Sequence, residues 1–220
     1  MQDKSLYDVN TVGMESVLST NKVLKNTYML LGMTLLFSAV TAGISMAMGL
    51  PHGAAMVLTL VGFGLLFVVN RMADSSKGLI AIFAFTGVMG ASIGPLLNYY
   101  MSMPGGPALV MQALGGTAVV FFGLSAYALT TRKDFSFMGG FLMVGLLVAV
   151  VAMIANIFLA IPALSLTISA AVVMIMSGLI LFDTSRIING GETNYIRATV
   201  SLYLNIYNLF IHLLLSLIHI

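Results

Sequence analysis

Seven long apolar segments run through this sequence, and they constrain its fold more than any other feature. Short polar breaks separate them, and they cover residues 27–50, 54–69, 78–100, 107–129, 135–160, 163–182 and 198–220. A helix needs about 20 apolar residues to cross the hydrocarbon core of a bilayer. Only 7% of the residues are charged, against about a quarter in soluble domains. The sequence therefore predicts an all-α membrane protein with seven transmembrane helices.

Basic residues occur only in alternate breaks between these segments. Besides Lys4 near the N-terminus, they precede the first segment and follow the second, fourth and sixth: Lys22, Lys25, Arg71, Lys77, Arg132, Lys133, Arg186 and Arg197. The breaks around Pro51, Pro104 and Pro162 contain neither lysine nor arginine. Because cytoplasmic loops of membrane proteins carry the excess of basic residues, the N-terminus is expected in the cytoplasm. Seven spans then place the C-terminus on the opposite side.

The N-terminal residues differ from the rest of the chain in polarity. Residues 1–26 carry polar side chains and charges of both signs, and they lack the apolar stretch of a secretory signal. We expect residues 1–26 to form a cytoplasmic tail. The transmembrane domain is then expected to comprise residues 27–220.

The third apolar segment is rich in glycine toward its end. It contains Gly87, Gly90, Gly94 and Pro95. Proline interrupts the hydrogen-bond ladder of a helix, and glycine lets two helices approach closely in a membrane. We therefore expect a kink, or a tight contact with a neighbouring helix, near the end of this segment.

Asp183 is an ionisable residue placed directly after the apolar run of the sixth segment. A carboxylate at membrane depth is costly, and it usually has a charged partner or faces a water-filled cavity. Two interpretations are open from position alone. Asp183 is either a proton- or cation-sensitive site, or a helix-end residue that lies in the headgroup region.

The last apolar segment carries a polar face. Ser201, Asn205, Asn208 and His212 recur at spacings of three and four, which places them on one side of a helix. Such a face should contact protein or water and not lipid. It is expected either to form hydrogen bonds between helices or to line a polar pathway. His212 is expected either to report pH or to meet water near the opposite interface.

The sequence offers little support for catalysis. It contains no HExxH motif, no phosphate-binding loop and no paired aspartates within the apolar segments. Because cysteine is absent, disulfides, thiol catalysis and thiolate metal sites are excluded. We expect the protein not to be an enzyme, and we expect neither a cofactor nor a bound metal ion.

Four strings in the second half of the chain resemble the Bax inhibitor-1 (transmembrane BAX inhibitor motif) family. They are residues 126–140 (AYALTTRKDFSFMGG), 181–188 (LFDTSRII), 190–197 (GGETNYIR) and 201–210 (SLYLNIYNLF). The resemblance extends from about Ser19 to the end of the chain. It is closest to the bacterial YccA-type branch of the family.

This resemblance implies a seven-helix fold with the last helix at its centre. It also implies the bacterial inner membrane, so the side opposite the cytoplasm, where the C-terminus is expected, is the periplasm. For the YccA-type branch it implies association with the membrane-anchored AAA protease FtsH, as a substrate that competes for the protease and so restrains it. That role needs a cytoplasmic tail that the protease can grip, and residues 1–26 fit this need.

The wider family implies a second function, a pH-sensitive calcium leak. In that family two aspartates on the last two helices share a proton, and an arginine from the second helix can latch them. Asp183 matches the first aspartate, Asn205 stands in place of the second, and Arg71 is the counterpart of the arginine. Asn205 cannot ionise, so a hydrogen bond between Asp183 and Asn205 is expected, or an ion pair of Asp183 with Arg71 or Arg186.

Two hypotheses for the function follow from these residues and this resemblance. The first is an inner-membrane modulator of FtsH-type proteolysis. The alternative is a calcium-leak channel, in which Asp183 and Asn205 form the polar constriction and Ca²⁺ is the transported ion.

Overall fold

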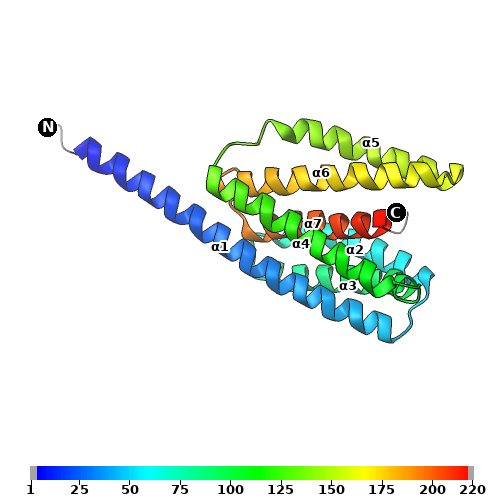
Figure 1. Cartoon of the computed structure of the whole chain (residues 1–220). Coiled ribbons are helices and arrows are strands. Elements are labelled where there is room, and N and C mark those ends of the chain that lie inside the picture. The colour runs from blue at the N-terminus through cyan, green and yellow to red at the C-terminus, as the bar shows by residue number, and fades with distance from the viewer. Residues whose placement is uncertain (1–3, 218–220) are drawn as a thin grey trace.

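The computed structural model describes residues 4–217, with side chains from residue 19 onward. It contains seven α-helices joined by short turns (Figure 1). They are α1 (Lys4–Ala47), α2 (His52–Met72), α3 (Lys77–Met101), α4 (Gly106–Thr131), α5 (Met138–Leu159), α6 (Pro162–Ile188) and α7 (Tyr195–Leu217). Each is long and apolar enough to cross a membrane, α1 from Ser19 onward. The all-α fold with seven spans is confirmed.

Helix α7 lies in the centre of the bundle (Figure 1). It packs against α1, α3, α4 and α6, whereas α2 packs mainly against α3, and α5 mainly against α6. The side chains of Leu202, Tyr203, Leu209 and Leu214 on α7 are fully buried. The central position expected for the last helix is therefore confirmed.

The outer helices α2 and α5 expose large apolar side chains. Phe63 and Phe67 on α2 and Phe141 and Phe158 on α5 are all more than half exposed. An exposed apolar surface of this extent marks a contact with a membrane or another apolar partner. The lipid tails of a bilayer cover such a surface on all sides of a bundle.

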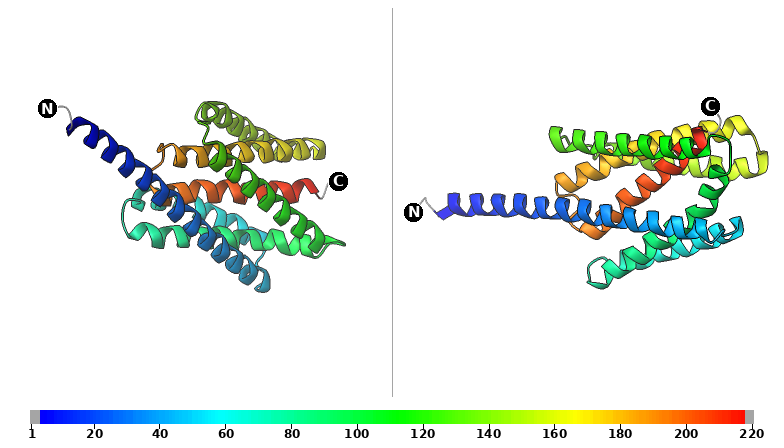
Figure 2. Two further views of the ribbon diagram at one scale, coloured as in Figure 1. Left: turned by 60° about the vertical axis from the view of Figure 1, so that its left-hand side comes forward. Right: turned by 60° about the horizontal axis from the view of Figure 1, so that its bottom comes forward.

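The charged residues gather at one end of the bundle. Helix α1 begins at this end, and the basic turns after α2, α4 and α6 lie there (Figure 1). The turns at the opposite end, residues 48–51, 102–105 and 160–161, contain no Asp, Glu, Lys or Arg. The start of α1 and the end of α7 lie at opposite ends (Figure 2). This distribution fits an odd number of spans, and the cytoplasmic location of the charged end remains a prediction.

Helix α1 is longer than the first apolar segment. It runs without a break from Lys4 to Ala47, and its N-terminal part projects beyond the other helices (Figures 1 and 2). The tail expected over residues 1–26 is thus helical from Lys4 and continuous with the first span. Residues 1–3 lie outside the described part of the chain.

The glycines of α3 allow a close contact with α1. A Cβ atom at Gly90 would overlap the backbone carbonyl of Ser38, and one at Gly94 would overlap the side chain of Ser45. Any larger residue at these two positions would push the helices apart. The tight helix contact expected from this glycine pattern is therefore confirmed, and its partner is α1.

Pro95 lies inside α3 and removes one backbone donor from that helix. The carbonyl of Ala91, four residues earlier, therefore has no N–H partner within the helix. The hydroxyl of Ser45 on α1 donates a hydrogen bond of 2.7 Å to this carbonyl. The proline thus creates a binding point for the neighbouring helix at the place where the glycines allow close approach.

Candidate functional site

Asp183 lies on α6 with its carboxylate directed at α7. Its side chain is buried, with 7% of the residue surface exposed. Its Oδ2 atom accepts hydrogen bonds from Ser201 Oγ at 2.5 Å and from Asn205 Nδ2 at 2.7 Å. Ser201 and Asn205 are four residues apart and share one face of α7. The structure therefore brings together three of the residues that the sequence singled out.

We refer to Asp183, Ser201 and Asn205 as the Asp183 cluster. Both hydrogen bonds come from neutral donors, and hydrogen bonds to an ionised carboxylate are about twice as strong as those between neutral groups. The cluster contains a single carboxylate, so it lacks the repulsion that makes two acids share a proton. Because Ca²⁺ takes about 6–8 oxygen ligands, these three side chains alone do not form a complete calcium site.

Arg71 does not reach Asp183. It is exposed in the last turn of α2. Helix α2 packs mainly against α3 on the outside of the bundle, which keeps this arginine away from α6. Within the described residues, the only ion pair joins Arg197 to Asp74. The ion pair between Asp183 and Arg71 that the sequence left open does not form.

Arg186 lies one turn after Asp183 but points to the loop beyond α6. Its guanidinium group donates a hydrogen bond of 3.0 Å to the carbonyl of Gly191 and lies 5.6 Å from the ring centroid of Phe182. Cations are favoured near the C-terminal end of a helix, where carbonyl groups carry partial negative charge. The expected ion pair between Asp183 and Arg186 is therefore also not formed.

The remaining residues of the polar face on α7 are Asn208 and His212. The Asn208 side chain donates to the carbonyl of Leu204 on its own helix, at 2.8 Å. His212 is 8% exposed, and its Nδ1 lies 3.4 Å from Ser169 Oγ on α6. His212 is thus largely enclosed between two helices. The packing of α6 on α7 is the reason.

A cavity of about 240 Å³ lies beside His212, between α5, α6 and α7. Its polar lining consists of Asn156, Ser165, Ser169 and His212. Asn156 donates to Ser165 Oγ at 2.6 Å, which ties α5 to the start of α6. This cavity lies at the uncharged end of the bundle, whereas the Asp183 cluster lies toward the charged end.

Apolar side chains separate that cavity from the Asp183 cluster. Along α6, the buried residues between Ser169 and Asp183 are Val172, Met176 and Ile180. None of them offers a hydrogen bond to water or to an ion. The buried face of α6 is therefore apolar between Ser169 and Asp183, whereas α7 carries Asn208 between Asn205 and His212.

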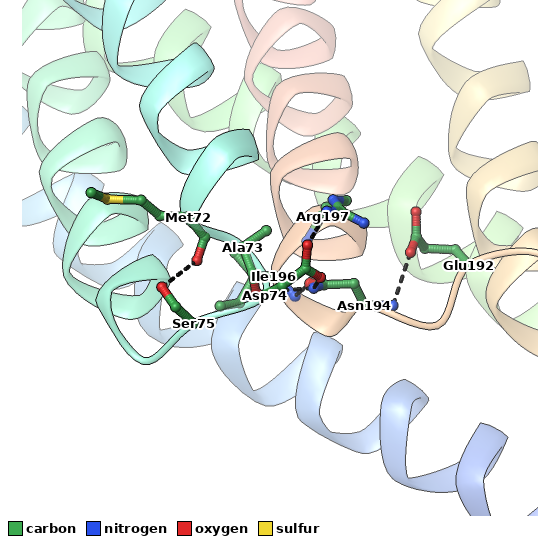
Figure 3. A network of polar contacts seen from close by, with 8 residues as sticks. All are labelled: Met72, Ala73, Asp74, Ser75, Glu192, Asn194, Ile196 and Arg197. Carbon is green, nitrogen blue, oxygen red and sulfur yellow. Dashed lines mark hydrogen bonds and ion pairs between the residues drawn. The ribbon is translucent and has the colours of Figure 1, made fainter.

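A further polar network joins the α2–α3 turn to the start of α7 (Figure 3). Asn194 Oδ1 accepts hydrogen bonds from the backbone N–H groups of Ile196 and Arg197, at 2.9 and 3.1 Å. Its Nδ2 donates to the carbonyl of Ala73 at 2.9 Å and to Asp74 at 2.8 Å. The sequence reasoning missed this residue, although asparagine directly before a helix is a recognised N-cap signal.

The sequence reasoning also passed over one hydrolase-like string, residues 90–94 (GASIG), which fits the GxSxG pattern. In serine hydrolases that serine lies on a strained turn between a strand and a helix. Here Ser92 lies inside α3 and donates to the carbonyl of Met89 at 2.8 Å, with the Tyr207 hydroxyl at 3.1 Å. Neither partner is a general base, so this string serves helix packing.

Residues 20–219 match the family described as "Inhibitor of apoptosis-promoting Bax1". The match covers nearly the whole chain, including all three members of the Asp183 cluster. The family-level expectation drawn from the four strings is therefore confirmed.

Three related proteins cover nearly the same length. An Escherichia coli K12 protein named "Modulator of FtsH protease YccA" is 58% identical over 200 residues, which are 90% of each chain. An uncharacterised membrane protein of Vibrio cholerae is 53% identical over 205 residues, 93% of this chain and 92% of that protein. An uncharacterised Pseudomonas aeruginosa protein is 46% identical over 214 residues, 97% of this chain and 96% of that protein.

Proposed function

Because the chain belongs to the Bax inhibitor-1 family, we propose that it is a non-enzymatic modulator of an FtsH-type membrane protease. The observation that carries this proposal is the 58% identity over 200 residues with the E. coli modulator of FtsH protease. A relative of the same identity is named "Inner membrane protein YccA". We assign the chain to the bacterial inner membrane, with a cytoplasmic N-terminus and a periplasmic C-terminus.

The proposed mechanism begins at the N-terminal part of α1. This part projects beyond the other helices at the charged end of the bundle (Figures 1 and 2). A protease that pulls its substrates from the cytoplasm needs such a projecting segment to engage. The first span then leads directly into the bundle, because α1 is one continuous helix from Lys4 to Ala47.

The bundle supplies the resistance that the mechanism needs. To extract α1, the protease must separate it from α3 and α7, against which it packs. The contact with α3 includes the close approach at Gly90 and the hydrogen bond from Ser45 to Ala91. A chain that is engaged readily and extracted slowly occupies the protease, and thereby restrains the degradation of other substrates.

The half-life of the protein in cells tests this mechanism. Removing residues 2–18 deletes the projecting part while leaving the span from Ser19 intact. The shortened protein should persist longer than the intact one after synthesis is stopped. A matched control replaces residues 2–18 with an unrelated helical segment of equal length, which separates the effect of length from that of sequence. In cells with inactive protease, all three proteins should persist equally. Equal decay of shortened and intact protein in normal cells would contradict the mechanism.

The Asp183 cluster supports a second candidate function, that of a calcium-leak channel. A buried carboxylate between two spans is the kind of group that marks an ion pathway. Calcium flux into liposomes that contain the purified protein tests this candidate. Flux that disappears in Asp183→Asn would support it, because the variant keeps the shape of the side chain and loses its charge. Flux that is unchanged in Asp183→Asn would remove Asp183 from any gate.

A further inference from the structure

A cavity of about 310 Å³ lies at the charged end of the bundle, between α1 and the ends of α4 and α6. Each of the three helices contributes one apolar side chain to it: Leu24, Leu129 and Ile188. Its polar side is formed by Thr20, Asn21, Arg132 and Asn189. The cavity is therefore amphipathic, with an apolar wall beside a polar rim.

The ends of the three surrounding helices indicate the level of this cavity in the bilayer. The apolar span of α1 begins at Ser19, that of α4 ends at Thr131 and that of α6 ends at Ile188. All three spans thus begin or end at the cavity. In a bilayer this level is occupied by phospholipid headgroups and the first carbons of the acyl chains.

The polar rim has donors that no other described residue uses. Thr20, Asn21 and Arg132 form no side-chain hydrogen bond or ion pair with the described residues. Arg132 is exposed and caps α4 in a left-handed conformation, with φ of 49°. A guanidinium group with free donors is well suited to a phosphate.

A second cavity at the same end provides a contrast. It has a volume of about 370 Å³ and is lined by Asp74 and Asn194. The Asn194 amide already donates to Ala73 and Asp74, and Arg197 is paired with Asp74. An acidic side chain and occupied donors make this second cavity unsuitable for a phosphate. Of these two cavities, only the first is lined by a basic side chain, Arg132, that has no partner among the described residues.

The charge balance in the first cavity restricts the ligand further. Helices α4 and α6 both end there, and a helix C-terminus carries about half a unit of negative charge. Arg132 is the only charged side chain in the lining, so the lining places one positive group beside two negative helix ends. A headgroup with a phosphate and an N–H cation satisfies both the arginine and the terminal carbonyl groups.

We propose that this cavity binds a phospholipid whose headgroup carries a primary ammonium, of which phosphatidylethanolamine is the simplest. Its phosphate accepts hydrogen bonds from Arg132 and Asn21. Its ammonium donates to carbonyl groups in the last turns of α4 and α6. The glycerol region contacts the apolar wall formed by Leu24, Leu129 and Ile188.

Native mass spectrometry of the full-length protein in detergent tests this proposal. Phosphatidylethanolamine, phosphatidylcholine and phosphatidylglycerol with identical acyl chains are added separately at equal concentration, and the bound fraction is measured. Choline differs from ethanolamine by three methyl groups that remove every N–H donor. Retention of the ethanolamine lipid should exceed that of the choline lipid about tenfold, as expected for the loss of charged hydrogen bonds.

Two variants locate the site. Arg132→Gln should lose the preference for the ethanolamine lipid, and Asn21→Ala should weaken it. Lys77→Gln is the matched control, because Lys77 is an exposed basic residue at the same end that does not line the cavity. Circular dichroism should show that all three variants keep the helical content and melting temperature of the intact protein.

Three results would overturn the proposal. One is an ethanolamine preference that survives in Arg132→Gln. Another is tighter retention of phosphatidylglycerol than of phosphatidylethanolamine, which would indicate attraction by charge alone. The third is displacement of the bound lipid by millimolar inorganic phosphate, which would indicate a site for free phosphate. The proposal requires that phosphate leaves the lipid bound and that Lys77→Gln behaves as the intact protein does.

Discussion

The amide group of Asn205 on α7 donates a hydrogen bond of 2.7 Å to the carboxylate of Asp183 on α6. This contact joins the central helix of the bundle to its neighbour at a buried position. An amide needs no proton from solvent to make this bond. The contact therefore differs in kind from a pair of acids, which can approach each other closely only when they share a proton.

Loss of the Asp183 carboxylate should destabilise the bundle. In Asp183→Ala the donors of Ser201 and Asn205 lose their acceptor, and a buried donor without a partner costs about 1–3 kcal/mol. Asp183→Asn keeps an acceptor oxygen and should cost less. Thermal unfolding in detergent, followed by helical circular dichroism, measures both variants, since the chain has no tryptophan or cysteine to serve as a probe. Equal losses in the two variants would contradict this account.

Placing a second acid in the cluster should make stability depend on pH. In Asn205→Asp two carboxylates meet, and two unit charges 4 Å apart repel by about 4 kcal/mol at an effective dielectric constant of 20. Proton uptake relieves part of this repulsion at low pH. The variant should therefore be less stable at pH 8 than at pH 5 by about 1–3 kcal/mol, relative to the intact protein.

The double variant Asp183→Asn with Asn205→Asp is the control for this pH effect. It restores one acid and one amide in exchanged positions. Its stability should change between pH 5 and pH 8 no more than that of the intact protein. A pH dependence in the double variant as large as in Asn205→Asp would show that repulsion within the pair is not the cause.

The contact between Ser45 and the Ala91 carbonyl should depend on Pro95. Ser45→Ala leaves that carbonyl unpaired and should cost about 1–3 kcal/mol. In Pro95→Ala the restored backbone N–H can donate to Ala91 within α3, so removal of the Ser45 hydroxyl should then cost less. A double-mutant cycle on thermal unfolding measures this coupling. Additive effects of the two substitutions would contradict the proposed pairing.

Asn194 should contribute more to the stability of the bundle than the neighbouring ion pair between Arg197 and Asp74 does. Arg197 and Asp74 are 41% and 69% exposed at their side chains, and exposed ion pairs contribute about 0–1 kcal/mol. Asn194→Ala removes a helix cap worth about 0.5–2 kcal/mol, together with the bonds to the α2–α3 turn. Asn194→Ala should therefore lower the melting temperature more than Arg197→Gln does. The reverse order would show that the ion pair, and not the cap, fixes the start of α7.

Much of the fold could be predicted from the sequence. Segment length and the alternation of basic breaks depend only on local composition, and they indicated seven helices. The extension of α1 back to Lys4 could not be predicted in this way, because residues 4–18 mix apolar with polar and charged side chains and contain no long apolar run. The hydrogen bond from Ser45 to Ala91 depends on the register between α1 and α3, which no local pattern contains.

The candidate site could be predicted only in part. The spacing of Ser201 and Asn205 predicted that they share one face of a helix. The resemblance to the Bax inhibitor-1 family predicted that this face contacts Asp183. The sequence left three possible partners for Asp183: Asn205, Arg71 and Arg186. Whether an arginine side chain reaches Asp183 depends on how the helices pack, which the sequence does not show. The burial of His212 likewise follows from the packing of α6 on α7, and not from its place near a helix end.

The turnover of another FtsH membrane substrate in cells tests the central claim most directly. Its half-life is measured in cells that lack this protein and in cells that produce it, at equal levels of the protease. If the protein is a modulator that occupies the protease, the half-life of the other substrate should lengthen when the protein is produced. An unchanged half-life, with the protein present in the membrane at normal amount, would contradict the proposed function.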